Sequence, residues 1–200
     1  MISVRNRIHI RLFVVVALVC LFIVVLWYYP VPVLTSQLHG GALMKVVVTV
    51  YYEALCPDSK YFLTKQLLPT FKIAKSIMEV KLAPYGKAKT KEHNDPLLRL
   101  EVATCMIMDN HSPQEAMNKC TSQINFDDSV IQNCFESYRG VDLLKVIGES
   151  TNSLRPPITF IPTITIDGSQ GRQESILKDL LSEVCKAAGD SREVKDICKI

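Results

Sequence analysis

VVVTVYYEALCPDS, at residues 46–59, joins a β-branched run to a short turn, one cysteine and a proline. Valine, threonine and tyrosine favour strands, so we expect a buried strand over Val46–Tyr52. Pro57 suits the first position of a helix, where its missing N–H group is not needed. The stretch therefore predicts a strand that delivers Cys56 to a helix N-terminus, where N–H groups and the helix dipole stabilise a thiolate.

The strand and helix pattern continues on both sides of a polar loop. The helix that Pro57 opens continues through apolar residues to Met78, and Pro69 is expected to kink or restart it. Residues 80–85 predict a second strand. Thr163–Ile166 predicts a third strand, which a proline opens and an Asp-Gly turn closes.

Helical patterns fill the sequence between the second and third strands and follow the third. Gly140 is expected to end the third helix of this group, and residues 176–184 form a last amphipathic helix. The order strand, helix, strand, helical insert, strand, helix predicts one α/β domain at residues 45–200, with the insert at about 94–150. The insert helices are predicted at 97–108, after a capping box at 112–115, after Asp127 or Asp128, and at 141–147.

Net charge limits the classes of partner. The 200 residues carry a formal net charge of +3. Arg5, Arg7 and Arg11 supply this surplus, because the basic and acidic residues that follow residue 44 balance. A nucleic-acid-binding domain normally carries a basic face. We therefore expect no nucleic-acid partner.

The N-terminal residues have the pattern of a targeting segment. Residues 12–29 are free of charge and follow three arginines, which predicts a cytoplasmic tail at residues 1–11. A signal-anchor or a signal peptide is expected at residues 12–34, and the missing small-x-small cleavage site favours the anchor. Both alternatives place residues 45–200 in the secretory lumen or outside the cell.

Six of the seven cysteines fall in the predicted luminal domain, where disulfides form readily. If Cys56 is a free nucleophile, at least one other cysteine is unpaired or pairs between chains. Cys20, inside the apolar segment, is either inert or a lipidation site. Cys105–Cys120 and Cys185–Cys198 are two pairings that we consider, although the sequence leaves the connectivity open. The candidates for structural disulfides are Cys105, Cys120, Cys134, Cys185 and Cys198.

The predicted catalytic residues are Cys56, Ser59 and Pro162. Pro162 opens the third strand, where a thioredoxin-type fold places a cis-proline opposite its reactive cysteine. Ser59 can donate a hydrogen bond to the Cys56 thiolate but cannot close a disulfide, so exchange needs an external thiol. The negative charge of Asp58 opposes a thiolate nearby. The alternatives are a bridged or inactive Cys56 and an ordinary edge-strand Pro162.

Other chemistry has little support in the sequence. There is no Cys-x-x-Cys pair, no His-x-x-x-His spacing and no glycine-rich phosphate loop, so we expect no metal and no cofactor. Asn110-His111-Ser112 is a glycosylation sequon, and we leave its occupancy open because Pro113 follows it.

Several stretches together resemble the interferon-gamma-inducible lysosomal thiol reductase family, in an insect-like form. The resemblance implies a thioredoxin-like fold with a helical insert, and reduction of protein disulfides in endosomes or lysosomes that serves host defence. It matches Cys56 to the attacking cysteine and Pro162 to the cis-proline. Ser59 stands where the family has its resolving cysteine, and the family's Cys-Gln-His-Gly signature is absent. The matching stretches are residues 48–57, 83–88, 105–106 and 154–163.

We therefore expect a thiol–disulfide oxidoreductase that acts on protein disulfides in the endosomal, lysosomal or secretory pathway, with a single reactive thiol. Its partners would be disulfide-containing proteins, an external small or protein thiol, and the membrane through residues 12–29. The alternative is a catalytically impaired binding module, tethered to a luminal membrane face, with a groove around Cys56, Pro162 and Tyr52. A third hypothesis is a structural protein with all six luminal cysteines bridged.

Overall fold

The computed structural model describes residues 14–21, 44–84 and 95–199. The chain divides into two units, Met1–Ala42 and Leu43–Ile200. In the first unit residues 14–21 are helical. None of the helices in the described ranges is long and apolar enough to cross a bilayer. Most of the predicted anchor at residues 12–29 lies outside the described residues.

The second unit is built on a three-stranded sheet in the order β2-β1-β3. The central strand β1 (Val46–Tyr52) pairs in parallel with β2 (Met78–Pro84) and antiparallel with β3 (Thr163–Ile166). Strands β1 and β3 have the predicted bounds. Met78 was predicted at the end of a helix but is the first residue of β2, so the helix is shorter than its apolar pattern indicated.

The first helix is continuous over residues 57–74 but changes its hydrogen bonding in the middle. It consists of α2 (Pro57–Tyr61), the π-helical segment η1 (Phe62–Leu67) and α3 (Leu68–Ala74). Leu68 N–H bonds to the carbonyl of Leu63, five residues earlier. The wider turn comes directly before Pro69, which has no N–H to donate and whose ring crowds the preceding turn. The expected irregularity at Pro69 is therefore a π-helical turn.

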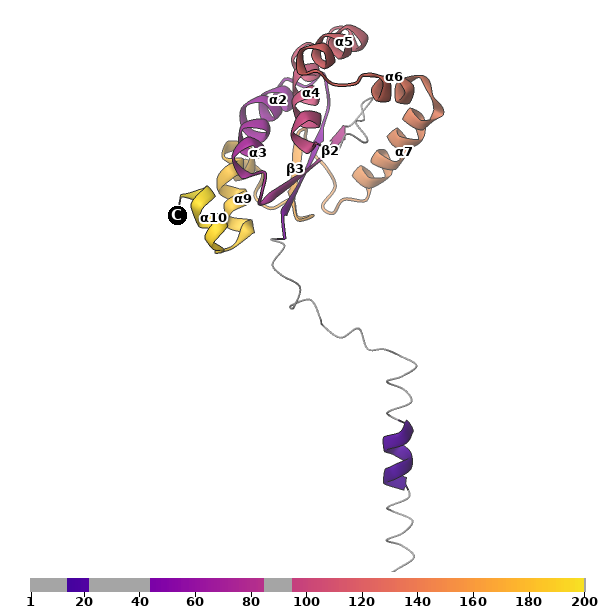
Figure 1. Cartoon of the computed structure of the whole chain (residues 1–200), viewed down its shortest axis with the longest axis vertical. Helices are drawn as coiled ribbons and strands as arrows, with labels where there is room; N and C mark the ends of the chain where they lie inside the picture. The colour runs from indigo at the N-terminus through magenta and orange to yellow at the C-terminus, as the bar shows by residue number, and fades with distance from the viewer. Residues whose placement is uncertain (1–13, 22–43, 85–94, 200) are drawn as a thin grey trace, which may run out of the picture. The chain divides into compact units, whose positions relative to one another are not determined.

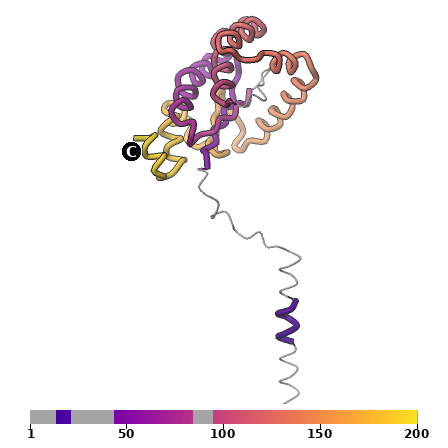
Figure 2. Tube along the Cα trace, in the orientation of Figure 1, coloured from indigo at the N-terminus to yellow at the C-terminus, as the bar shows by residue number. Residues whose placement is uncertain are grey.

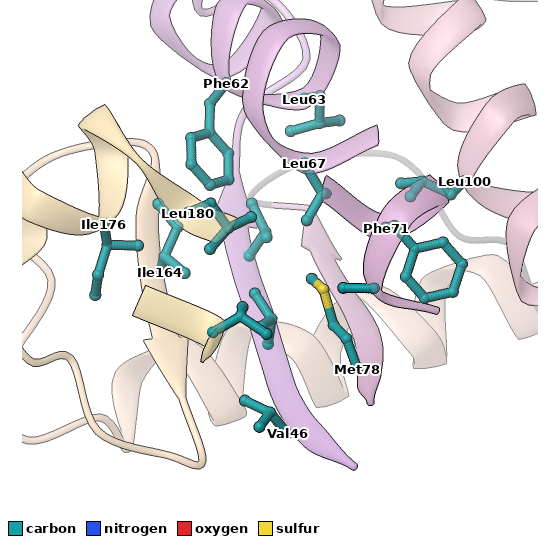
Figure 3. Packing of buried hydrophobic residues seen from close by; sticks show 14 of the residues in the cluster. Val46, Phe62, Leu63, Leu67, Phe71, Met78, Leu100, Ile164, Ile176 and Leu180 are labelled. Carbon is teal, nitrogen blue, oxygen red and sulfur yellow. The ribbon is translucent and has the colours of Figure 1, made fainter. Parts of the chain in front are cut away.

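The hydrophobic core lies between the sheet, the first helix and the C-terminal helices (Figure 3). Phe62 and Leu67 extend from the helix toward β1, and Leu180 approaches from the C-terminal side. These side chains are almost fully buried, and each contributes roughly 1.5–3 kcal/mol by leaving water. This packing fixes the start of the first helix against the end of β1, and Cys56 lies at that junction.

Between β2 and β3, the described residues form four helices, α4 (Pro96–Met108), α5 (Pro113–Ile124), α6 (Ser129–Glu136) and α7 (Tyr138–Asn152). In Figure 1, α6 and α7 lie on the opposite side of this unit from α9 and α10. The α6–α7 break falls at Ser137, whose backbone is extended, and not at Gly140 as predicted. Gly140 lies inside α7, at a position where a Cβ would come within 2.7 Å of the Cys134 carbonyl oxygen, so the close approach of the two helices requires glycine there.

The C-terminus forms three short helices, which the tube in Figure 2 shows in yellow. They are α8 (Gln173–Lys178), α9 (Leu180–Ala188) and α10 (Arg192–Cys198). The single helix predicted over residues 176–184 is wrong, because Asp179 leaves the helical conformation. The Asp179 side chain accepts a hydrogen bond from Ser182 N–H and so caps α9.

Candidate active site

Cys56 is the N-cap residue of α2, directly after the turn that follows β1. Its backbone is extended, with φ −77° and ψ 122°, and Pro57 opens the helix. The side chain is partly buried, and its Sγ atom lies 3.7 Å from the carbonyl oxygen of Ile161. A thiol is a weak hydrogen-bond donor. The contact therefore places the sulfur against the segment before β3 and leaves it free to react.

Pro162 follows Ile161 directly, and the peptide bond between them is cis. Pro162 is buried, and β3 begins at the next residue. The Thr163 hydroxyl donates to the Phe160 carbonyl at 2.6 Å, which fixes the turn around the proline. Two of the three predicted catalytic residues, Cys56 and Pro162, therefore occupy adjoining positions although they are far apart in the sequence.

Ser59, the third predicted catalytic residue, faces inward. Its side chain is completely buried, and its Oγ atom accepts a hydrogen bond from Glu53 N–H at 3.3 Å. In the described part of the chain it makes no hydrogen bond with Cys56. The predicted bond from Ser59 to the reactive sulfur is therefore not formed. Ser59 instead ties the first helical turn to the end of β1.

The turn that carries Cys56 is held by its own polar groups and by one residue from the insert. Cys56 N–H donates to the Glu53 carbonyl at 3.2 Å, and Leu55 N–H donates to the Glu53 carboxylate at 3.1 Å. The side-chain amide of Asn110 donates to the Ala54 carbonyl. Sequence reasoning identified Asn110 only as a sequon and gave no role to Glu53. Proximity to Cys56 could have indicated Glu53, but only the fold brings Asn110 there.

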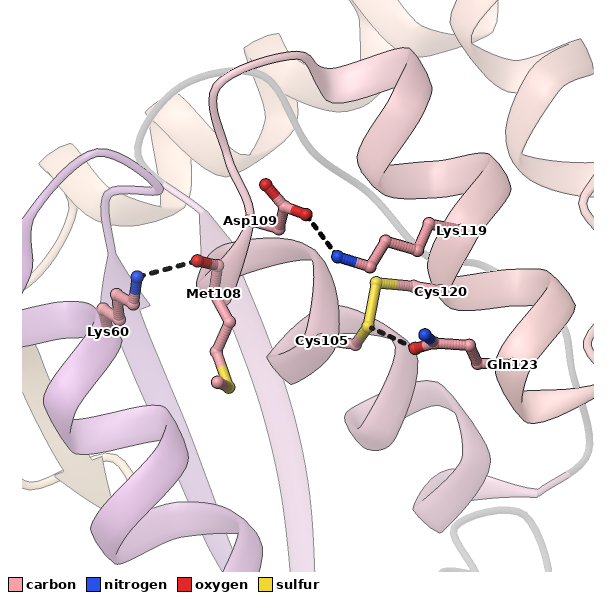
Figure 4. A network of polar contacts seen from close by, with 7 residues as sticks. All are labelled: Lys60, Cys105, Met108, Asp109, Lys119, Cys120 and Gln123. Atoms are coloured by element: carbon pink, nitrogen blue, oxygen red, sulfur yellow. Dashed lines mark hydrogen bonds and ion pairs between the residues drawn. A yellow bond between two sulfur atoms is a disulfide. The ribbon is translucent and has the colours of Figure 1, made fainter.

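The α4–α5 corner that presents Asn110 is braced on several sides (Figure 4). Lys60 of α2 donates through Nζ to the Met108 carbonyl at 2.7 Å, near the C-terminal end of α4. A lysine is favourable there because the last carbonyls of a helix lack partners. A disulfide between Cys105 and Cys120 joins α4 to α5.

Asp109, in the same corner, forms an ion pair with Lys119 of α5, with Oδ2 2.7 Å from Nζ. The hydrogen bond and the positive charge of Lys119 lower the pKa of the Asp109 carboxyl below its ordinary value of 3.8. The carboxylate therefore keeps its charge, and its bond to Lys119, in moderately acidic surroundings.

Tyr52 does not line a groove, so that part of the binding-module hypothesis is wrong. Only 5% of the residue is exposed, and it belongs to the hydrophobic core. Burial raises the pKa of its phenol to about 12. The residue takes part in packing at the end of β1 and is not available to a partner.

Ile161, whose carbonyl oxygen contacts the Cys56 sulfur, is one of the residues that line an open pocket of about 310 Å³. The segment before β3 and the end of α7 form its walls. Phe160, at 43% exposure, is the most accessible large apolar side chain along this wall. The lining residues are Thr151, Asn152, Pro157, Ile158, Thr159, Phe160 and Ile161.

The cysteines divide into bridged and free ones. The structure pairs Cys105 with Cys120 and Cys185 with Cys198, the two pairings that the sequence analysis considered. Cys134, named there as a candidate for a structural disulfide, is free, and so is Cys56. The structure therefore contradicts the hypothesis that all six luminal cysteines are bridged. Within the described residues, no cluster of three or more histidine, cysteine or acidic side chains could hold a metal ion.

Comparison with known proteins gives consistent results. The family model described as gamma interferon inducible lysosomal thiol reductase matches residues 47–98. A gamma-interferon-inducible lysosomal thiol reductase of Mus musculus is 28% identical over 184 residues, which are 76% of this chain and 71% of the mouse protein. A similarly named, reductase-like protein of Anopheles gambiae is 28% identical over 160 residues, covering 60% of this chain and 66% of that protein.

These comparisons confirm the resemblance to the thiol reductase family, including its insect members. Among solved structures, the chain is similar to DsbL of Salmonella enterica serovar Typhimurium, with a TM-score of 0.45 and 7% sequence identity. That similarity covers 76% of this chain and 92% of DsbL. The fold itself is mixed α/β, with a three-stranded sheet and a helical segment between its second and third strands.

Proposed function

We propose that this protein is a thiol–disulfide oxidoreductase of the thioredoxin-like class, and that Cys56 is its single reactive thiol. The observation that carries the proposal is the position of Cys56. Its sulfur is free, partly exposed, at the start of a helix and 3.7 Å from the Ile161 carbonyl oxygen. The match of the thiol reductase family model to residues 47–98, which include Cys56, supports the same chemistry.

The reaction begins when Cys56 loses its proton. The thiolate attacks one sulfur of a substrate disulfide, the substrate S–S bond breaks, and the departing sulfur leaves as a thiolate that takes up a proton. Cys56 is then joined to the substrate in a mixed disulfide. Ser59 cannot resolve this bond, because it has no sulfur and its hydroxyl is buried against Glu53.

An external thiol completes the cycle. Its thiolate attacks the mixed disulfide, releases the second substrate sulfur as a thiol, and forms a new disulfide with Cys56. A second external thiol then restores Cys56 and leaves as an external disulfide. Two external thiols are oxidised for each substrate disulfide reduced. We propose protein disulfides as substrates, with the cavity beside Ile161 receiving a neighbouring side chain of the substrate polypeptide.

A turnover assay tests this proposal. The purified domain is incubated with a fluorescence-quenched disulfide-linked protein and millimolar glutathione. Cys56→Ser is expected to abolish the increase in rate over glutathione alone. Cys134→Ala is the matched control, because Cys134 is the other free cysteine of this domain and lies on α6. Turnover by Cys56→Ser at the wild-type rate would contradict the proposal. Retention of the substrate by Cys56→Ser without turnover would favour the binding-module alternative.

We propose a luminal location for the domain, in the lysosomal or secretory pathway, with the membrane tether at residues 12–29. The two disulfides and the names of the relatives support an oxidising or lysosomal compartment. The uncharged segment after three arginines supports the tether. Alkaline carbonate extraction tests the tether. An anchored chain stays with the membrane pellet, and a chain released entirely into the supernatant would contradict the proposed tether.

A further inference from the structure

Asn110 lies where the helical insert contacts the turn at residues 53–56, which carries Cys56. Its side-chain amide donates to the carbonyl of Ala54, two residues before Cys56. A carbonyl oxygen can only accept a hydrogen bond, so the amide nitrogen must face it. Asn110 is partly buried, and it belongs to a corner already fixed by the Lys60–Met108 bond and by the Cys105–Cys120 disulfide.

Apart from the contact of the Cys56 sulfur with the Ile161 carbonyl, the other polar bonds described for this turn come from within it or from the helix it opens. Glu53 accepts from Cys56 N–H through its carbonyl and from Leu55 N–H through its carboxylate. The Ala54 carbonyl is the turn's anchor to the insert, and Asn110 supplies the donor. Without this donor, the bonds within the turn remain, but the Ala54 carbonyl loses its bond to the insert. The position of Cys56 relative to Ile161 would then be less strictly fixed.

We propose that Asn110 is a positioning residue for Cys56. Its amide holds the turn before the cysteine and so keeps the thiol at the start of α2, against Ile161. This inference rests on the proposed role of Cys56. This role needs only the side-chain N–H of Asn110, a residue that also lies in a sequon. A glycan would attach to the same nitrogen that donates to Ala54, so the two uses of this residue must be separated by experiment.

Two substitutions of Asn110 remove the donor. Asn110→Asp has the same shape but turns the donor into a charged acceptor that faces another acceptor, and Asn110→Ala removes the group without adding charge. Ser112→Ala is the matched control, since it destroys the sequon and keeps the amide. It disturbs the helix little, because Ser112 is the N-cap of α5 without a side-chain capping bond.

The measured quantity is the second-order rate constant for alkylation of Cys56 by iodoacetamide, followed from pH 5 to 9 by peptide mapping. Cys134 in the same molecule is the internal reference, because general loosening of the fold would increase its reactivity. We expect both Asn110 variants to slow Cys56 alkylation about fivefold, the effect of losing one net hydrogen bond. Cys134 should react as in the wild type, and Ser112→Ala should leave both rates unchanged.

Two results would overturn the inference. If Cys56 reacts at the wild-type rate in both Asn110 variants, the amide does not position it. If Ser112→Ala slows the reaction as much as the Asn110 variants do, the glycan is responsible. Alkylation does not require turnover, so this outcome is independent of the disulfide-reduction assay. A wild-type protein without reductase activity would contradict the proposed function alone.

Discussion

At the scale of single residues, two residues separate Cys56 from Ser59, which is the spacing of the two cysteines in a dithiol reductase. The sequence allowed the position of Cys56 to be predicted, because a β-branched run and a helix-opening proline flank it. The direction of Ser59 could not be predicted in the same way. Whether its hydroxyl meets the reactive sulfur or the end of β1 depends on how the helix packs on the sheet, and in the structure it meets Glu53 N–H.

Ser59→Cys is expected to restore a dithiol site. The new thiol would lie one helical turn from Cys56 and could attack its mixed disulfide, so substrate would be released without an external thiol. Loss of the bond to Glu53 N–H should cost about 1 kcal/mol of unfolding free energy. Gel analysis of the substrate adduct checks this, with Thr64→Cys, farther along the same helix, as the control. Equal persistence of the adduct in Ser59→Cys and the wild type would contradict the expectation.

Tyr52 gives a prediction for alkaline pH. Its pKa is raised in the folded state to about 12, above the ordinary value of 10.0. The folded chain therefore keeps a proton that the unfolded chain loses, so this contribution is complete below pH 10 and is lost as the pH rises toward 12. Over this range the free energy of unfolding of the wild type should fall by roughly 2 kcal/mol relative to that of Tyr52→Phe. Urea unfolding of both proteins from pH 9 to 12 measures this difference. If the unfolding free energies of the two proteins fall in parallel with pH, the raised pKa of Tyr52 is contradicted.

At the scale of elements, β1, β3 and the start of α2 could be predicted from propensity and proline chemistry, because their signals are local. The division of the last helix at Asp179 could not, because its apolar residues keep a helical period across the break. The role of the α4–α5 corner could not be predicted for another reason. Its contacts with Ala54 and with Lys60 of α2 join residues about fifty positions apart, and no local pattern shows them.

The Asp109–Lys119 pair in this corner predicts acid behaviour. The folded-state pKa of Asp109 is lowered, so the pair's contribution is present above the unfolded pKa and is lost only as the pH falls through the lowered value. The Asp109–Lys119 ion pair of the α4–α5 corner should therefore persist at pH 5. Lys119→Gln should raise the Asp109 pKa toward 3.8, and Lys119→Arg should keep it low. NMR titration of the carboxyl carbon measures this, and an unchanged pKa in Lys119→Gln would refute it.

The exposure of Phe160 leads to a prediction about KM for large and small disulfide substrates. If its exposed ring packs against a bound polypeptide, Phe160→Ala should increase KM for a protein disulfide about tenfold, the value of a half-buried aromatic contact. A small disulfide such as oxidised glutathione should react as before. Phe135→Ala is the control, because Phe135 is an exposed phenylalanine on α6. If the two substitutions change KM equally, the proposal that Phe160 contacts the bound polypeptide is contradicted.

At the scale of the whole molecule, the family match and the proposed chemistry concern the same part of the chain. The matched residues 47–98 contain the parallel strand–helix–strand unit and Cys56. The insert and the C-terminal helices add the Asn110 anchor and two disulfides. If Cys56 is the reactive thiol, as we propose, the structure holds it in a complete strand–helix framework, and Ser59 takes the place of a second cysteine. This combination predicts an enzyme that depends on thiols from its surroundings.

The most direct test of this account is mass spectrometry of the purified domain after reaction with a disulfide-linked substrate in the absence of external thiol. We predict that the wild type accumulates a mixed disulfide mapped to the peptide that contains Cys56, and that glutathione then releases it. Cys134→Ala should form the same adduct. A substrate adduct that is absent, or that maps to Cys134 while Cys56 stays unmodified, would contradict the claim that Cys56 is the reactive thiol.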